Sequence, residues 1–275
     1  MANKRAKIII IPARMAASRL PNKPLADIAG KPMIQHVWER AMAADLAPVY
    51  VATDDRSIAD VIEQAGGKAV LTRTDHPSGS DRVFEAVETI DPQQQFQHIL
   101  NLQGDLPDMP AEIPRQLAAV LDHNDCDLAT LVTKASAEEA EKPQVVKAVV
   151  SWKDHGFGDA LYFSRASIPT GTNDKYHHIG VYGWHRPALA RFVTLPPSPL
   201  ELAEKLEQLR ALEAGMRIAV AEIDSAPGGV DTAEDLHAVR QRLAAVHHGE
   251  AGDEQTGQSK LAKIEKSQLD DGVLD

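Results

Sequence analysis

The chain has 275 residues, of which 43% are hydrophobic and 25% are charged, and its formal net charge at pH 7 is −11. A chain of this length can bury a substantial core, as one large α/β domain or as two small ones. The acidic balance argues against nucleic acid as a partner, because binding to a phosphate backbone depends on clustered lysine and arginine. No apolar run approaches the roughly 20 residues that span a bilayer, so no membrane partner is expected either.

The first residues do not follow the pattern of a signal peptide, because only four isoleucines follow the basic segment before Pro12 ends the apolar run. We therefore predict a cytoplasmic protein. Cys126 is the only cysteine, which excludes a disulfide within the chain and a thiolate cluster for a metal. We interpret this thiol as a small buried side chain.

The first half of the chain alternates between strand-like and helical patterns. Short apolar or β-branched runs that end in polar, glycine or proline residues predict three strands, at 7–13, 48–53 and 98–105. Two amphipathic helices are expected between them, at 32–45 and 57–67. Pro32 suits a first helical position, and Ser57 is the expected cap of the second helix. This alternation predicts a parallel sheet with helices on both faces.

The second half is less regular. Further strand-like runs lie at 145–152, 160–163, 178–184 and 217–223. A helix rich in leucine and glutamate is expected at 200–215, and another begins at Asp231 or Thr232. The connections around 73–80, 134–144 and 165–177 are long. Loops of that kind commonly carry function.

The last part of the chain differs from the rest. From about residue 247 it is polar and nearly free of aromatic and β-branched residues, so it cannot bury enough apolar surface to offset the entropy lost on ordering. We expect a disordered tail at 247–275, with at most a transient helical turn at 259–266, and a folded unit at 5–246.

Three cations gather in the loop that follows the first predicted strand: Arg14, Arg19 and Lys23. In an open parallel sheet, ligands bind at the carboxyl ends of the strands. Arginine offers a planar fork and lysine a mobile charge, so the three suit a triphosphate, and Pro12, Pro21 and Pro24 stiffen the loop that carries them. A basic loop is more often only a solvated surface. No glycine-rich dinucleotide fingerprint and no Walker loop is present.

Asp105 follows the third predicted strand at the same sheet edge. A carboxylate beside a triphosphate would repel it unless a divalent cation lies between them, so Asp105 is a candidate Mg²⁺ ligand. An ordinary turn aspartate is the competing interpretation. Asp231 can equally be a helix cap, with Glu234 completing a capping box.

The segment IPARMAASRLPNKPL at 11–25 closely resembles the signature of 3-deoxy-manno-octulosonate cytidylyltransferases. The likeness covers essentially residues 7–245. It continues in order through GKPMIQHVWERA (30–41), VATDD (51–55), TRTDHPSGSDR (72–82), NLQGDLP (101–107), LYFSRASIP (161–169), HIGVYGW (178–184), PSPLELAEKLEQLRALEAG (197–215) and GVDTAEDL (229–236).

This resemblance implies a Rossmann-like, GT-A-like nucleotidyltransferase fold. Its three layers would contain a mostly parallel central sheet and a smaller subregion for dimerisation and sugar binding. It implies one domain over 1–246, in which 5–130 mainly bind the nucleotide and 131–246 mainly bind the sugar and form a homodimer. The activity implied is Mg²⁺-dependent transfer of CMP from CTP to the anomeric 2-hydroxyl of 3-deoxy-D-manno-octulosonate (Kdo), which supplies CMP-Kdo for lipopolysaccharide.

The resemblance also assigns the nucleotide site. The expected contacts are Pro12, Ala13, Arg14, Arg19, Lys23, Thr72, Arg73, Ser78 and Gln103. Arg14, Arg19, Lys23 and Asp105 would be catalytic, with the cations neutralising the departing pyrophosphate, and Asp105 with Asp231 would hold Mg²⁺. From the residues alone, Ser78 to Ser80 would be a flexible turn before a helix at 81–90.

For the sugar acid, the resemblance points to Gln103, Arg165, His178, Tyr182, Glu207 and Gln208. An arginine can pair with a carboxylate through two parallel hydrogen bonds, and the others can bond hydroxyls. Structural roles are the alternative: a lone histidine on a strand is more often structural, and Glu207 with Gln208 could face solvent on an amphipathic helix.

Two departures from the family pattern remain. Leu106 stands where many relatives have glutamate, and the segment 170–176 is shorter than in some relatives, which leaves the exact sugar open. Another sugar nucleotidyltransferase, acting on sialic acid or a sugar 1-phosphate, is the alternative enzyme. A non-catalytic nucleotide-sugar binding protein is the alternative from another class.

Overall fold

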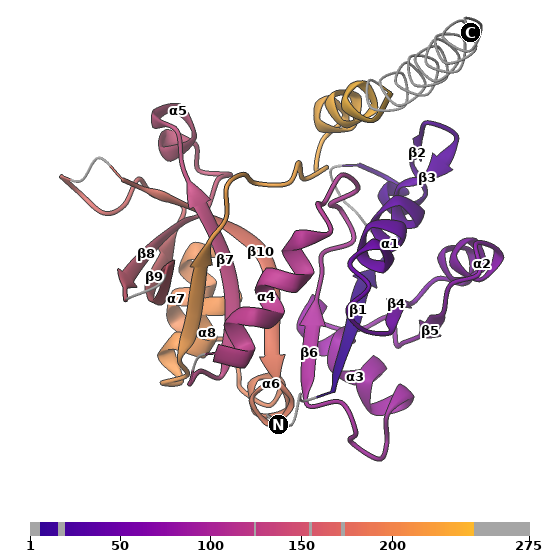
Figure 1. Cartoon of the computed structure of the whole chain (residues 1–275), viewed down its shortest axis with the longest axis horizontal. Coiled ribbons are helices and arrows are strands. Elements are labelled where there is room, and N and C mark those ends of the chain that lie inside the picture. Colours follow the sequence, from indigo (N-terminus) through magenta and orange to yellow (C-terminus); the bar gives the residue numbers. More distant parts are fainter. Residues whose placement is uncertain (1–5, 16–19, 124, 154–155, 172–173, 245–275) are drawn as a thin grey trace, which may run out of the picture.

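The structure is a computed structural model and describes residues 6–15, 20–123, 125–153, 156–171 and 174–244. Arg19 and the predicted tail at 247–275 lie outside the described residues. One large sheet runs through both halves of the chain, with helices on its two faces (Figure 1). No helix in the described part is long and apolar enough to cross a bilayer.

The strand order of this sheet joins a parallel half to a mixed half. From one edge to the other the strands are β5 (Ala69–Leu71), β4 (Val49–Thr53), β1 (Lys7–Ala13), β6 (His98–Asn101), β10 (Tyr176–His185), β7 (Leu128–Lys134), β11 (Ile218–Glu222), β9 (Phe157–Ser164) and β8 (Lys147–Trp152). The first four are parallel to one another, as predicted. The prediction of a mostly parallel sheet does not extend to the other half, where β10 and β9 are antiparallel to their neighbours.

The four isoleucines of β1 build both faces of the core. Ile9 and Ile11 point to one apolar cluster and Ile8 and Ile10 to the other, because successive side chains of a strand alternate. The helices of the first cluster are α1 (Met33–Ala43), α2 (Arg56–Gln64) and α4 (Glu112–His123). Those of the second are α3 (Gly79–Ile90), α6 (Arg186–Val193) and α8 (Gln208–Glu213). The strand is therefore buried except at the partly exposed Pro12, in the middle layer of three.

Successive strands are added first on one side of β1 and then on its other side. The chain runs from β1 outward to β4 and β5, and then returns to the other side of β1 as β6. At such a switch point the loops after the two flanking strands part and leave room for a ligand. The loop after β1 and the segment after β6 meet there.

Several predicted boundaries need correction. The strand expected at 98–105 ends at Asn101, so Asp105 lies beyond it in a turn. Asp55, not Ser57, caps α2, because its carboxylate accepts the Ser57 main-chain N–H. Pro32 precedes α1 as its cap residue instead of being its first helical residue.

The helix expected at 200–215 is two helices, α7 (Pro199–Glu204) and α8. Lys205 between them has the left-handed conformation, at φ 56°, which ends a helix. β7, α4, α5 (Ala137–Glu141), α6 and β5 had not been predicted from the sequence.

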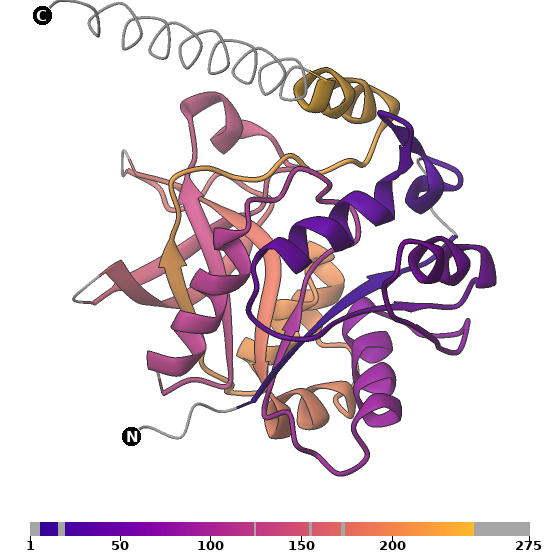
Figure 2. The same ribbon diagram turned by 45° about the vertical axis from the view of Figure 1, so that its right-hand side comes forward.

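A last helix at 233–244 lies against the small hairpin of β2 (Asp27–Ile28) and β3 (Lys31–Pro32), as Figures 1 and 2 both show. Thr232 and Asp235 cap it reciprocally. The expected capping box of Asp231 and Glu234 is therefore wrong by one residue, and the Asp231 carboxylate is directed elsewhere.

Candidate active site

A cleft of about 340 Å³ opens at the switch point between β1 and β6. It is lined by Pro12, Ala13, Arg14, Leu20, Lys23, Pro24, His76, Pro77, Ser78, Gly79, Arg82, Gln103, Gly104, Asp105 and Asp231. Segments far apart in the sequence thus supply one surface. Within the residues described, this surface includes every predicted nucleotide and metal residue except Thr72 and Arg73.

Lys23 joins the two predicted metal ligands. Its Nζ donates to Asp105 Oδ2 over 2.8 Å and to Asp231 Oδ1 over 3.1 Å. The third donor goes to the main-chain oxygen of Val230, also over 2.8 Å. Burial disfavours the ammonium, but the two carboxylates outweigh that cost, and the pKa of Lys23 is raised. The cation is therefore held firmly at the point where the two carboxylates converge.

The segment before the last helix brings Asp231 to the cleft. The Val230 main-chain N–H donates to the Asp105 carbonyl over 3.0 Å. The Val230 side chain is fully buried with Ile28 and Val239, and Arg240 donates to the carbonyl of Asp27. The helix is thereby docked on the β2–β3 hairpin (Figure 2), and Asp231 follows directly from the anchored Val230.

The end of β1 and the turn after β6 are packed in close contact. A Cβ atom at Gly104 would lie 2.8 Å from the carbonyl oxygen of Pro12, closer than such atoms can approach. Glycine is therefore required for the two segments to meet. Arg14 lines the cleft beside them with an exposed side chain, which leaves its guanidinium accessible to a ligand.

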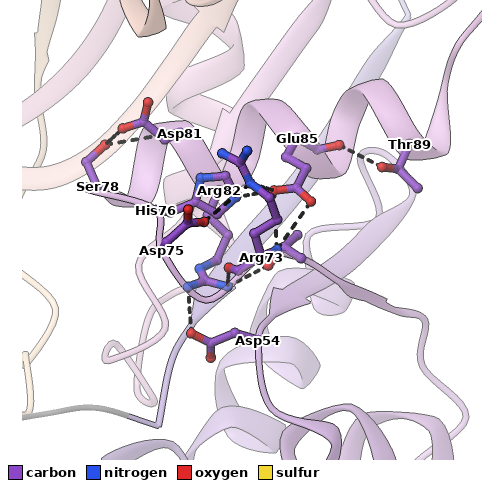
Figure 3. A network of polar contacts seen from close by, with 10 residues as sticks. Asp54, Arg73, Asp75, His76, Ser78, Asp81, Arg82, Glu85 and Thr89 are labelled. Atoms are coloured by element: carbon purple, nitrogen blue, oxygen red, sulfur yellow. Dashed lines mark hydrogen bonds and ion pairs between the residues drawn. The ribbon is translucent and has the colours of Figure 1, made fainter. Parts of the chain in front are cut away.

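The loop at 72–79 is held by Arg82 of α3, a residue that sequence reasoning did not select. Its guanidinium donates to the Thr72 hydroxyl, to the Arg73 carbonyl and, over 2.9 Å, to Asp54 (Figure 3). Glu85 accepts the Arg73 main-chain N–H and pairs with His76. The predicted residues Thr72 and Arg73 therefore belong to this network and do not line the cleft.

Ser78 connects this loop to the second half of the chain. It caps α3, and its Oγ lies 2.6 Å from Glu207 Oε1 and 2.6 Å from Asp81 Oδ2. One hydroxyl proton cannot serve both carboxyl groups. Burial raises the pKa of Glu207, which favours its protonated form, and that form can donate to Ser78. Glu207 does not face solvent as the alternative interpretation proposed.

The other predicted sugar residues form a buried cluster beside Glu207. His178 Nε2 lies 2.9 Å from the Thr130 hydroxyl, and Gln208 Nε2 lies 3.5 Å from His178 Nδ1. The His178 and Tyr182 rings are 5.6 Å apart. Burial lowers the pKa of His178 to about 3 and raises that of Tyr182. Both side chains are therefore neutral hydrogen-bonding groups at pH 7.

Gln103 and Arg165 are placed differently from each other. Gln103 lines the cleft, and its Cγ lies 3.9 Å from the Cβ position of Gly180, between His178 and Tyr182 on β10. The Arg165 guanidinium donates to the main-chain oxygens of Glu204, Pro143 and Lys205. Gln103 thus links the two predicted sites, whereas Arg165 braces the connection between α7 and α8.

Comparison with known proteins agrees with this geometry. A family model described as cytidylyltransferase matches residues 8–218. The 3-deoxy-manno-octulosonate cytidylyltransferase of Rhodopseudomonas palustris (strain HaA2) is 54% identical over 238 residues, which cover 86% of this chain and 97% of that protein. The enzyme of the same name from Parvibaculum lavamentivorans is also 54% identical, with coverage of 86% and 92%. The chain belongs to the 3-deoxy-manno-octulosonate cytidylyltransferase family.

Solved structures extend the comparison to the fold. That of CMP:2-keto-3-deoxy-manno-octonic acid synthetase complexed with CTP is 42% identical, with a TM-score of 0.79, and covers 87% of this chain and 99% of that one. The apo-UDP-glucose pyrophosphorylase structure has a TM-score of 0.66 at 15% identity, covering 88% and 99%. The second likeness concerns the fold alone, and together they confirm an α/β nucleotidyltransferase fold.

The residues of this cytidylyltransferase are suited to a magnesium ion. Asp105 and Asp231 already direct carboxylate oxygens at one positive group, the Lys23 ammonium. Mg²⁺ prefers oxygen ligands and is usually bound by one or two carboxylates, with water and substrate phosphates completing its shell. In the described part of the chain no group of three or more histidine, cysteine or acidic side chains could hold a metal.

Two further predictions concern single residues. Leu106 is 8% exposed and packs in the core, so in this member of the family the residue after Asp105 contributes apolar packing instead of a carboxylate. Cys126 is partly buried, and burial raises the pKa of its thiol to about 11. The thiol is protonated at pH 7, in keeping with a packing role.

Proposed function

We propose that this enzyme transfers CMP from CTP to the anomeric 2-hydroxyl of Kdo and releases pyrophosphate, in a reaction that requires Mg²⁺. The observation that carries the proposal is the convergence of Lys23, Asp105 and Asp231 in the cleft that Arg14 and Ser78 also line. The names of the relatives support the choice of CTP and Kdo.

The chain's own residues act by position and charge. The hydroxyl oxygen of Kdo forms a bond to the α-phosphorus and releases its proton to solvent, while the bond from the α-phosphorus to the oxygen that bridges it to the β-phosphate breaks, and negative charge grows on the departing pyrophosphate. Arg14, Arg19 and Lys23 would neutralise that charge. Mg²⁺, held by Asp105 and Asp231, would act as a Lewis acid on the phosphate oxygens.

The sugar would lie between the cleft and the buried cluster on β10, where Gln103 faces both. Neutral His178, Tyr182 and Gln208 offer hydrogen bonds to hydroxyls. His178 cannot take the hydroxyl proton effectively, because a group with a pKa of about 3 is a weak base at pH 7. The Arg165 guanidinium uses three of its five N–H groups on main-chain oxygens, which leaves two for the sugar carboxylate.

A pyrophosphate-release assay with CTP, Kdo and Mg²⁺ tests the reaction, and a panel of other nucleotides and sugar acids tests its specificity. Asp105→Asn should lower turnover by at least about a hundredfold while the circular dichroism spectrum stays unchanged. Asp60→Asn removes the same charge from an exposed site on α2 and should keep full activity. Near-normal turnover in Asp105→Asn would contradict the metal role.

We further propose, from the family resemblance, that the enzyme is a cytoplasmic homodimer that serves lipopolysaccharide synthesis. Sedimentation velocity measures the association directly.

A further inference from the structure

The Lys23 ammonium has no hydrogen-bond donor left for a phosphate. An ammonium carries three N–H donors, and Nζ has three acceptors within 3.1 Å: Asp105, Asp231 and the carbonyl of Val230. Its side chain is only 16% exposed. In this arrangement Lys23 is committed to the two carboxylates and cannot also bind the pyrophosphate group of a nucleotide.

We propose that Lys23 is an internal cation that takes the place of the metal between Asp105 and Asp231 until a nucleotide arrives, so that metal and nucleotide must enter together. The inference rests on the proposed function and goes beyond it, because it concerns the order and coupling of binding. Without a cation at this point the two carboxylates, which both approach the Lys23 Nζ, would repel each other.

The backbone around Lys23 favours a movement of the side chain alone. Lys23 begins a short 3-10 helix, Lys23–Leu25, with Asn22 in the left-handed conformation before it and the buried Pro24 after it. The main chain is thereby fixed, whereas a lysine side chain has a flexible four-carbon stem. Phosphate oxygens offer the ammonium new acceptors, and the freed carboxylates can then accept a divalent cation.

A free divalent cation brings no phosphate oxygens that could accept the Lys23 ammonium in place of the carboxylates. It must displace an ammonium that is tethered to the site and present at high effective concentration, and only water then accepts the displaced donors. We therefore expect the metal to bind weakly to the free enzyme and much more tightly with CTP. A coupling of this kind between two ligands commonly amounts to about 5- to 150-fold in affinity.

Titration with Mn²⁺, followed by electron paramagnetic resonance in the absence of nucleotide, tests the proposal. Lys23→Gln keeps a donor for the Val230 carbonyl but removes the charge, and it should bind Mn²⁺ at least about tenfold more tightly than the wild type. Lys31→Gln is the matched control, because Lys31 is 47% exposed and paired with Glu39; its Mn²⁺ affinity should equal that of the wild type.

A Lys23→Gln affinity for Mn²⁺ within about twofold of the wild type would overturn the proposal. Lys23 would then serve only to link Asp105, Asp231 and the Val230 carbonyl within the fold. If Lys23→Gln unfolds without metal, Mn²⁺ alone should restore its circular dichroism spectrum; a chain that stays unfolded at saturating Mn²⁺ also overturns it.

The outcome is separable from that of the proposed function. A wild type that releases pyrophosphate from CTP and Kdo, together with unchanged Mn²⁺ binding in Lys23→Gln, refutes the internal cation alone. A wild type without turnover refutes the proposed function, whereas tighter Mn²⁺ binding by the variant would still support the competition at the two carboxylates.

Discussion

Asp54→Asn removes the counterion of the arginine that holds the loop at 72–79. Arg82 Nη2 and Asp54 Oδ2 are 2.9 Å apart, and the two side chains are only 4% and 14% exposed. Asparagine preserves the shape of the site but leaves the buried guanidinium without a charged partner. Breaking a buried ion pair on one side costs about 3 to 5 kcal/mol. Since Thr72 and the Arg73 carbonyl still accept from Arg82, we expect the lower end, about 3 kcal/mol.

Urea denaturation measures this loss directly, and thermal unfolding provides a second measurement. For a chain of this size about 1 kcal/mol lowers the Tm by about 2 °C, so the Tm should fall by about 6 °C. The KM for CTP should rise as well, because the same loop carries Ser78 into the cleft.

The control is Asp60→Asn, whose partner Arg56 is 61% exposed; an exposed pair contributes at most about 1 kcal/mol. Equal stability losses in Asp54→Asn and Asp60→Asn would refute the claim that burial makes the first pair critical.

Two further predictions concern the contact at the switch point and the buried histidine. Gly104→Ala should destabilise the chain by about 1 to 3 kcal/mol and raise the KM for CTP, because its Cβ would lie 2.8 Å from the Pro12 carbonyl oxygen. The control Gly180→Ala, whose Cβ would have its nearest neighbour at 3.9 Å, should lose less stability. Equal losses of the two variants in urea denaturation would contradict the steric argument. The pKa of His178 falls from 6.5 to about 3 on folding, so below pH 6.5 the unfolded chain gains a proton that the folded chain does not. Wild-type stability should therefore fall, relative to His178→Gln, by about 2 kcal/mol between pH 7 and pH 5, and parallel pH profiles of the two in urea denaturation would contradict it.

The elements that the sequence predicts well are those whose local pattern agrees with their burial. β1 is the clearest case, because its isoleucines serve both faces of a central strand. β7 was missed, although it lies in the middle of the mixed half. It buries Thr130, whose hydroxyl lies 2.8 Å from the carbonyl of Val181 and 3.1 Å from that of Ile179. Because the acceptors for this buried hydroxyl lie on a strand some 50 residues away, the sequence around Thr130 does not show that they exist.

The same limit applies to the site. The pattern at 200–215 is helical throughout, but Arg165 bonds the carbonyls of Glu204 and Lys205 where the helix breaks, and that contact cannot be read from periodicity. Family resemblance selected Asp231, while the residues alone suited a helix cap equally well. Asp54 and Arg82 were overlooked because a buried ion pair between a loop and a helix has no spacing rule.

The distance along the chain between Lys23 and Asp231, 208 residues, has a consequence for biosynthesis. A nascent chain that still lacks its last folded segment holds the basic loop, the sheet and Asp105, but not the second carboxylate. Asp231 lies late in the sequence, so the proposed metal site can be completed only after most of the chain has been synthesised. An unfinished polypeptide therefore lacks one of the two carboxylates that converge on Lys23.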